Sequence, residues 1–151
     1  MRFVIQVVSQ AQVTVDEEVV GKIGPGMMVL VGVSGEDTRE TADRMIKKML
    51  GLRIFPDENG KTNLSLSQVG GSLLMVSKFT LYADCTRGNR PGFTLAGAPD
   101  MASGMYDYIL AQCAMQVPVV EKGIFGADMK VSLTNEGPFT IILDSKELFG
   151  M

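Results

Sequence analysis

Apolar and polar side chains alternate along the first part of the chain, and this alternation predicts β-strands. The alternation in residues 10–15 is typical of a strand with one buried face. The acidic residues 16–18 predict a turn, and residues 19–23 predict a returning strand. Residues 27–33 are nearly all apolar, so we expect a strand there that is covered on both faces.

Two later segments place their apolar residues every three or four positions, which is the period of a helix. Asp37 and Glu40 resemble a capping box, and the apolar positions of residues 42–50 predict the helix behind it. We expect a second helix to begin near Pro99, because proline is favoured in the first helical turn. Four residues share one side of this second helix: Met101, Met105, Ile109 and Cys113.

The remaining apolar segments again predict strands. Residues 72–81 form a strong strand pattern, residues 129–134 alternate, and residues 139–143 resume after an interruption at residues 135–138. The order is therefore strands, helix, strand, helix, strands. Because hairpin-like spacing dominates and no regular βαβ repeat occurs, we expect an α+β fold with a mixed, largely antiparallel sheet.

Composition and charge indicate a globular domain and limit how the protein could bind nucleic acid. The 151 residues are 46% hydrophobic and 21% charged, as in a single globular domain and unlike a disordered chain. The formal net charge of −3 excludes nucleic-acid binding through bulk positive charge, but it leaves room for a local basic patch. Arg87, Arg90, Lys122 and Lys130 are candidates for a phosphate-binding patch, with solvated surface charge as the alternative.

The chain contains no histidine, which excludes Ser-His-Asp triads, Cys-His dyads, histidine-ligated zinc and a histidine general base. The cysteines, Cys85 and Cys113, are too few for a metal site, and we expect both to be reduced thiols. We therefore expect no metal and no cofactor. No apolar run approaches the ~18 residues of a membrane span, so we expect a cytoplasmic protein.

Residues 77–80, at the end of the strong strand pattern, interrupt its apolar run. On an ideal strand, Ser77 and Phe79 face one side, whereas Lys78 and Thr80 face the other. Hydroxyl and ammonium groups need hydrogen-bond partners at this place if they are buried. One interpretation is an edge that handles an ester or a phosphate, with backbone N–H groups directed at a developing oxyanion. The alternative is a strand that simply emerges into solvent.

The interruption at residues 135–138 is the second irregular feature. Its sequence is Asn-Glu-Gly-Pro, and proline cannot donate to a β-ladder, so Pro138 belongs at an edge, a bulge or a turn. The dipeptide of Gly137 and Pro138 could present two carbonyl oxygens to a ligand in a fixed geometry. The alternative is an ordinary turn between the last two strands.

These two segments resemble sequence motifs of the D-aminoacyl-tRNA deacylase family. Residues 77–81 (Ser-Lys-Phe-Thr-Leu) are similar to its Ser-Gln-Phe-Thr-Leu motif, and residues 135–140 (Asn-Glu-Gly-Pro-Phe-Thr) are similar to its Asn-x-Gly-Pro-x-Thr motif. The similarity continues over the whole chain, including residues 3–6, 51–55, 87–91 and 125–129. Two motifs in the family's order, within a full-length match, make the resemblance specific.

The resemblance implies a homodimeric hydrolase with one domain, residues 1–151. Together with the strand and helix pattern, it predicts an α+β fold in which mixed, largely antiparallel sheets form a barrel-like core with two main helices. Enzymes of this family cleave the ester bond between a D-amino acid and tRNA, and also remove glycine, as a chiral proofreading step in translation. The expected substrates are therefore D-aminoacyl-tRNA and glycyl-tRNA.

The resemblance assigns a role to Gly137 and Pro138. They match a cis Gly-Pro element that one subunit inserts into its partner's site, where the carbonyls hold the substrate's α-amino group and leave no room for an L side chain. This is specificity by steric exclusion. Val7 stands where many family members have an arginine that braces this element, so we expect the brace to come from elsewhere.

The resemblance also implies a set of residues near the substrate. Phe79, through its backbone, and Thr80 match positions that line the pocket close to the scissile ester. Phe125 matches a position near the adenine, where an aromatic ring can stack. Ser77 and Lys78 complete the predicted substrate-binding residues, and Lys78 replaces the family's usual glutamine.

Two mechanisms are open on this evidence. In the first, the substrate's 2′-hydroxyl and backbone donors promote hydrolysis; we favour it because an aliphatic hydroxyl without an adjacent base is a poor nucleophile. In the second, Thr80 is the nucleophile and Lys78, on the same strand face, is a base whose neutral form is favoured by burial.

Two other functions are also open: a deacylase with relaxed chirality that acts on L-aminoacyl-tRNA, and a non-catalytic RNA-binding module of the same fold.

Overall fold

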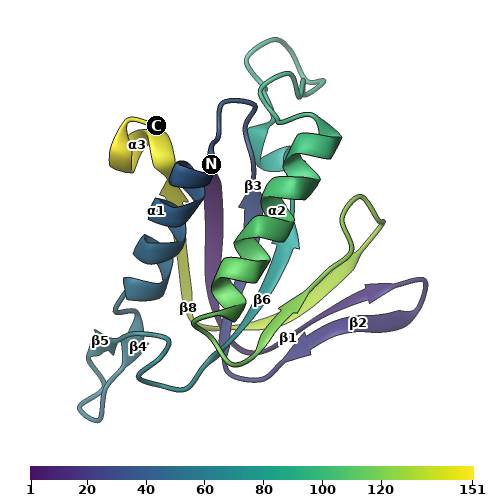
Figure 1. The fold of residues 1–151 in the computed structure, drawn as a ribbon. Coiled ribbons are helices and arrows are strands. Elements are labelled where there is room, and N and C mark those ends of the chain that lie inside the picture. Colours follow the sequence, from purple (N-terminus) through teal and green to yellow (C-terminus); the bar gives the residue numbers. More distant parts are fainter.

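Six strands form a mixed sheet that is nearly closed into a barrel, and two long helices cover one of its faces (Figure 1). The computed structural model describes all residues, Met1–Met151. In chain order the elements are β1 (Arg2–Val15), β2 (Glu18–Ile23), β3 (Gly26–Gly32), α1 (Arg39–Gly51), β4 (Phe55–Pro56), β5 (Thr62–Leu64), β6 (Ser72–Ser77), the 3-10 turn η1 (Phe79–Tyr82), α2 (Pro99–Ala114), β7 (Val120–Lys122), β8 (Lys130–Asp144) and α3 (Ser145–Phe149). None of the helices is long and apolar enough to cross a membrane.

The long strand β1 organises the sheet. It pairs antiparallel with β2, β3 and β8, whereas β3–β6 and β6–β7 are parallel. The strand order is β2-β1-β3-β6-β7, with β8 added on β1. The predicted α+β class, with a mixed and largely antiparallel sheet, a barrel-like core and two main helices, is therefore confirmed.

The continuous apolar pattern of β3 results from burial on two faces. Met27, Val29 and Val31 belong to the larger core, which also includes buried side chains of α1 and α2. Met28 points to the other face and joins a smaller core with residues of β1, β2 and β6. Successive side chains of a strand point to opposite faces, so one apolar run serves both cores. This confirms the prediction for residues 27–33.

A glycine allows β2 and β7, the first and last strands in this order, to approach each other. A Cβ atom built on Gly21 of β2 would lie 2.5 Å from the carbonyl oxygen of Lys122 in β7. Only a residue without a side chain permits such a close backbone approach. The sheet therefore curls far enough to enclose the smaller core.

Three predictions of local structure were wrong in detail. Helix α1 is capped by Thr38, whose hydroxyl accepts a bond from the Thr41 amide, rather than by Asp37. The Asp37 carboxylate instead accepts bonds from the buried N-terminal ammonium group of Met1 (2.8 Å) and the Ser34 amide (2.7 Å). Asp37 does not cap the helix because its carboxylate pairs with this ammonium group, and a buried ammonium group requires a partner.

The second difference concerns α2, whose buried side chains are Ala102, Tyr106, Ile109 and Cys113. Met101 and Met105, which were predicted on this face, are only partly buried beside it. The third difference is that β6 ends at Ser77 instead of continuing to residue 81, and it determines the geometry of the site.

Candidate functional site

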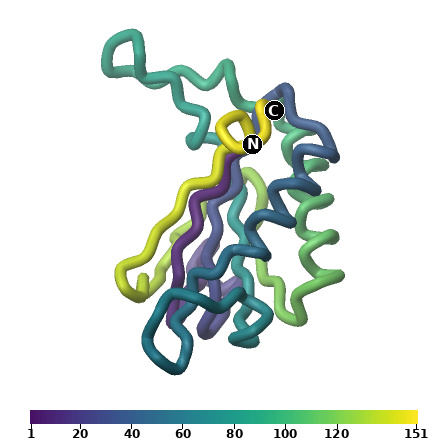
Figure 2. Tube along the Cα trace, turned by 90° about the vertical axis from the view of Figure 1, so that its left-hand side faces the viewer, coloured from purple at the N-terminus to yellow at the C-terminus, as the bar shows by residue number.

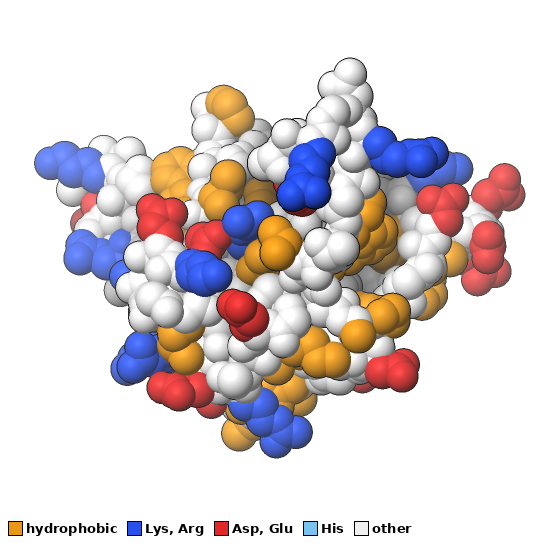
Figure 3. All heavy atoms as spheres, turned by 90° about the horizontal axis from the view of Figure 1, so that it is seen from above, with side chains coloured by type: hydrophobic (Ala, Val, Ile, Leu, Met, Phe, Trp, Pro, Cys, Tyr) orange, Lys and Arg blue, Asp and Glu red, His pale blue; other side chains and the backbone are white.

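A pocket of about 430 Å³ opens where β6, η1, the start of α2 and the segment before β8 meet. Seen from above, hydrophobic side chains line a hollow in the surface (Figure 3). The pocket is lined by Val33, Ser77, Lys78, Phe79, Phe93, Ala96, Gly97, Pro99, Ala102, Phe125, Gly126, Ala127 and Met129. Most of the lining is apolar, and no carboxylate belongs to it.

The end of β6 brings three predicted residues to this pocket. The Lys78 amide donates to the Val31 carbonyl over 2.8 Å, which extends the pairing with β3 by one residue. The chain then tightens into η1, where the Leu81 amide donates to the Lys78 carbonyl. As a result Phe79 is 57% exposed at the mouth of the pocket.

The same turn separates Lys78 from Thr80. The prediction that they share one strand face was wrong, because Lys78 precedes η1 and Thr80 lies within it. Thr80 is outside the pocket lining. Lys78 is exposed, so the burial that the base hypothesis required is also missing. The pocket thus contains Ser77, Lys78, Phe79 and Phe125, but not Thr80, the nucleophile of the alternative mechanism.

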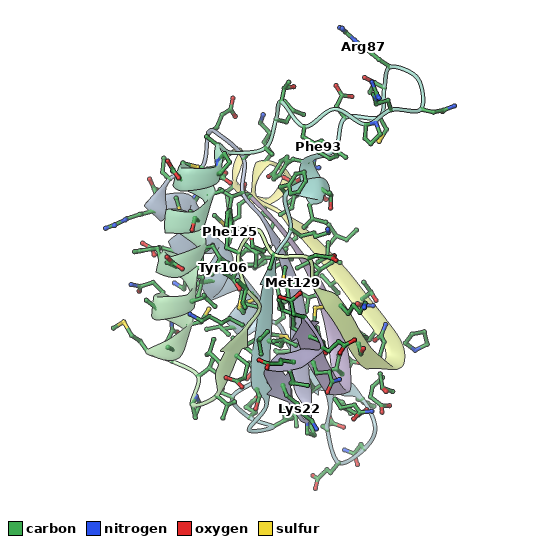
Figure 4. All side chains as sticks on the ribbon, turned by 90° about the vertical axis from the view of Figure 1, so that its right-hand side faces the viewer. Lys22, Arg87, Phe93, Tyr106, Phe125 and Met129 are labelled. Atoms are coloured by element: carbon green, nitrogen blue, oxygen red, sulfur yellow. The ribbon has the colours of Figure 1, made fainter.

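Aromatic side chains from three separate segments form the walls. The rings of Phe79 and Phe93 pack edge to face with centroids 4.9 Å apart. On the other wall, Phe125 lies 6.3 Å from the ring of Tyr106, whose hydroxyl donates to the Met75 carbonyl over 2.6 Å. Figure 4 shows Phe93 above Phe125, Tyr106 and Met129. Phe93 was not predicted, although an aromatic residue directly after the polar residues 84–92 was a usable signal.

The Asn-Glu-Gly-Pro segment is a bulge inside β8. Opposite β1, Gln6 pairs with Thr140 but Val8 pairs with Asn135, so residues 136–139 leave the ladder together. The interpretation as a turn between two strands was therefore wrong, since one strand continues through it. Gly137 has φ +119°, a conformation that favours glycine, and the peptide bond between Gly137 and Pro138 is cis.

Side chains of the motif itself brace this bulge. The Asn135 Oδ1 atom accepts from the Phe139 amide over 3.1 Å, and its Nδ2 atom donates to the Thr140 hydroxyl over 3.1 Å. Gln6 reaches the same hydroxyl over 3.4 Å. Val7 is buried in the core on the strand opposite, so the brace comes from Asn135 and Thr140, without an arginine at position 7.

The tip of the bulge lies away from the pocket of its own chain. Gly137 and Pro138 are exposed and are absent from the pocket lining. β8 bends sharply at the bulge, at the opposite end of the molecule from residues 84–92 (Figure 2). A single chain therefore does not bring the two sequence motifs together.

The other predicted groups are dispersed or are not placed to bind metal. Arg87 and Arg90 lie on an exposed loop, whereas Lys122 ends β7 and Lys130 begins β8. Cys85 and Cys113 are free thiols, as predicted. No group of three or more histidine, cysteine, aspartate or glutamate side chains is placed to hold a metal ion.

Comparisons with known proteins show which family and fold the chain is similar to. The family model described as D-Tyr-tRNA(Tyr) deacylase matches residues 4–144. A solved structure described as "c-Myc DNA Unwinding Element Binding Protein" is 40% identical in sequence, with a TM-score of 0.91 and coverage of 95% of this chain and 98% of that chain. Another, described as a probable eukaryotic D-amino acid tRNA deacylase, is 19% identical, with a TM-score of 0.82 and coverage of 94% and 97%, which shows a shared fold.

Because the hydroxyl of Tyr106 is buried, the free energy of unfolding should decrease as the pH rises above 10. Burial raises the pKa of Tyr106 from 10.0 to about 12. As the pH rises, the unfolded chain therefore loses this proton before the folded chain does. The stability that the protonated hydroxyl contributes is lost between pH 10 and about pH 12. We expect Tyr106→Phe to lose roughly 1 kcal/mol at pH 8 through the missing hydrogen bond. Between pH 8 and pH 11, its free energy of unfolding in urea should fall by about 1 kcal/mol less than that of the wild type. Parallel pH profiles would contradict this assignment.

Proposed function

This chain belongs to the D-Tyr-tRNA(Tyr) deacylase family, and from this premise we propose that it removes D-amino acids, and also glycine, from tRNA. Members of this family are hydrolases of the aminoacyl-tRNA ester bond, and this chain is such an enzyme. One observation carries the finer proposal: Ser77, Lys78 and Phe79 of the first motif meet Phe125 in one aromatic pocket.

The pocket suits the 3′-terminal adenosine and its amino acid. Its volume of about 430 Å³ lies within the range of small-ligand sites, which are mostly apolar with a few polar groups that fix orientation. Phe125 offers a ring on which the adenine stacks. Ser77, Lys78 and the backbone of Phe79 then bind near the ester, at the mouth where Phe79 is exposed.

We assign the chemistry to the substrate and to backbone donors. A water molecule attacks the carbonyl carbon of the ester, the bond from that carbon to the ribose 3′-oxygen breaks, and a proton from the water passes to that oxygen. The neighbouring 2′-hydroxyl assists this proton transfer. The first amides of η1 lack an intrahelical acceptor, and Lys78 makes no side-chain bond to cap them, so the Phe79 and Thr80 amides are available to the oxyanion.

Thr80 is a weaker candidate for the nucleophile than the water molecule. Its hydroxyl makes no hydrogen bond to another side chain, and it lies outside the pocket lining. A threonine hydroxyl needs an adjacent base to be a good nucleophile at neutral pH. The geometry therefore favours assistance by the substrate.

We place Gly137 and Pro138 in the pocket of a second copy of the chain. The tip is exposed, it is braced by Asn135 and Thr140, and it lies outside its own pocket. β8 pairs only with β1, so one edge of this long strand is free, and Ile142 on it is 68% exposed. Free edges and exposed apolar side chains favour pairing with another chain. In the partner's pocket the rigid tip would exclude L side chains by steric contact.

We also place the activity in the cytoplasm. The free thiols of Cys85 and Cys113 are compatible with a reducing compartment, and the proposed substrates are aminoacylated tRNAs.

We expect the wild-type enzyme to hydrolyse D-Tyr-tRNA at least ~100-fold faster, in kcat/KM, than L-Tyr-tRNA, because steric exclusion acts on the L side chain alone. Glycyl-tRNA, which has no side chain to exclude, should also be cleaved. Release of radiolabelled amino acid measures all three rates. Rapid cleavage of L-Tyr-tRNA would instead support an editing enzyme with relaxed chirality. Binding of tRNA without any turnover would support a non-catalytic RNA-binding module.

We expect Thr80→Ala to keep kcat for D-Tyr-tRNA within about tenfold of the wild type, because the reaction does not pass through its hydroxyl. Single-turnover hydrolysis at saturating enzyme measures this rate, and Thr94→Ala on the exposed loop nearby is a matched control. A loss of ~1,000-fold or more with unchanged tRNA affinity would identify Thr80 as the nucleophile.

We expect Pro138→Ala to lower the preference for D-Tyr-tRNA over L-Tyr-tRNA by about tenfold or more, while the free energy of unfolding changes by less than about 1 kcal/mol because Pro138 is exposed. Paired hydrolysis assays give the preference, light scattering gives the oligomeric state, and Glu136→Ala at the same tip is the control. Unchanged preference in a folded dimer, or a wild-type protein that is monomeric at assay concentration, would contradict the role of the partner.

A further inference from the structure

Residues 84–92, here called the arm, project from the molecule beside the pocket and have no part in the proposed chemistry (Figures 1 and 2). The Asp84 amide donates to the Gly92 carbonyl over 2.7 Å, and the Gly92 amide donates back over 2.9 Å. These two bonds close the base of the arm. Every residue from 85 to 92 is exposed.

The arm carries positive charge at its far end. Between its two base residues it contains Arg87 and Arg90 and no acidic residue. The ion pairs of the structure involve neither arginine. At the base, the Asp84 carboxylate is occupied by the Thr86 amide (3.0 Å) and hydroxyl (2.6 Å). Figure 4 shows Arg87 at the tip, pointing away from the body.

Both ends of the arm are continuous with the pocket wall. The arm begins two residues after η1, and the Ala83 amide still donates to the Thr80 carbonyl. At its other end, Gly92 is followed directly by Phe93, which lines the pocket and packs edge-on against Phe79. The base of the arm therefore lies next to the mouth of the pocket.

The structure assigns to the arm the binding of RNA phosphates next to the 3′-terminal nucleotide, with Arg87 and Arg90 as the contacting groups. This assignment rests on the proposed function, because an ester held in the pocket requires the acceptor strand to leave past the mouth. A chain with net charge −3 attracts a polyanion only through local positive charge. Arginine suits this task because its guanidinium group binds phosphate through two parallel hydrogen bonds.

The decisive experiment compares two substrates that share the ester but differ in phosphates. D-Tyr-tRNA carries the full backbone, whereas D-tyrosyl-adenosine has the same ester on a nucleoside. The test variant is Arg87→Ala with Arg90→Ala in the full chain. Lys47→Ala with Lys61→Ala removes the same charge from exposed residues away from the arm and is the matched control.

For the arm variant we expect KM for D-Tyr-tRNA to rise by roughly 10–100-fold with kcat within about twofold, and hydrolysis of D-tyrosyl-adenosine to be unchanged. The slope of log affinity for uncharged tRNA against log salt, measured by fluorescence anisotropy, should decrease by about 1–2 in magnitude. Replacing both arginines with lysine should restore most of the affinity. The control variant should resemble the wild type on both substrates.

Three outcomes would overturn the assignment: unchanged tRNA affinity in the arm variant, equal losses on both substrates, or dissociation of the dimer, which would make the arm a contact between copies. Failure of the wild type to hydrolyse D-Tyr-tRNA would refute the proposed function. The anisotropy measurement would still decide the role of the arm, since it depends on affinity for uncharged tRNA alone.

Discussion

The antiparallel pairing of β1 with β8 is the constraint on which the rest of the structure depends. It joins the two longest strands over almost their full length, from Arg2 with Asp144 to Thr14 with Lys130. β1 also holds β3 along its first half and β2 along its second. A shift of one residue in β8 would turn every side chain to the opposite face and would remove Leu143, the buried residue of this strand, from the larger core. The bulge at residues 136–139 is where the chain departs from this pairing, and its position follows from the register on either side.

The same sheet sets the location of the pocket. β6 is buried until Val76 and reaches the surface at Ser77, where the parallel pairing with β3 ends. Backbone groups at the end of a strand need new partners, and η1 supplies some of them by turning the chain back on Lys78. The turn leaves Phe79 at the rim and its neighbouring amides at the start of a helical turn. The change from β6 to η1 therefore both ends the strand and forms one wall of the pocket.

The division of labour in the proposed enzyme follows from the side chains that are available. The pocket offers aromatic surface, one hydroxyl and one ammonium group, which suits binding and orientation more than proton transfer by the protein. Discrimination is assigned to a backbone element held by amide and hydroxyl bonds. A rigid backbone tip sorts substrates by shape, and shape discrimination needs no titratable group.

Much of the fold could be read from local pattern. The alternation in the second half of β1, the doubly buried run of β3 and the amphipathic α1 depend on burial that repeats with a short period, so the sequence alone predicts them. The short strands β4, β5 and β7 and the helix α3 were missed, because segments of so few residues carry too little periodic signal.

The sequence by itself determined which residue types the chemistry has to work with, and its two motifs indicated where to look. Only the tertiary structure decided which of these residues meet. It placed Ser77, Lys78, Phe79 and Phe125 around one pocket and joined them with Phe93, which lies outside both motifs. It placed Thr80 in η1, away from the face of β6, and it placed Gly137 and Pro138 at an exposed bulge in the middle of β8. The physical reason is that these positions depend on where a long ladder ends or bulges, which is set by contacts between segments far apart in the chain.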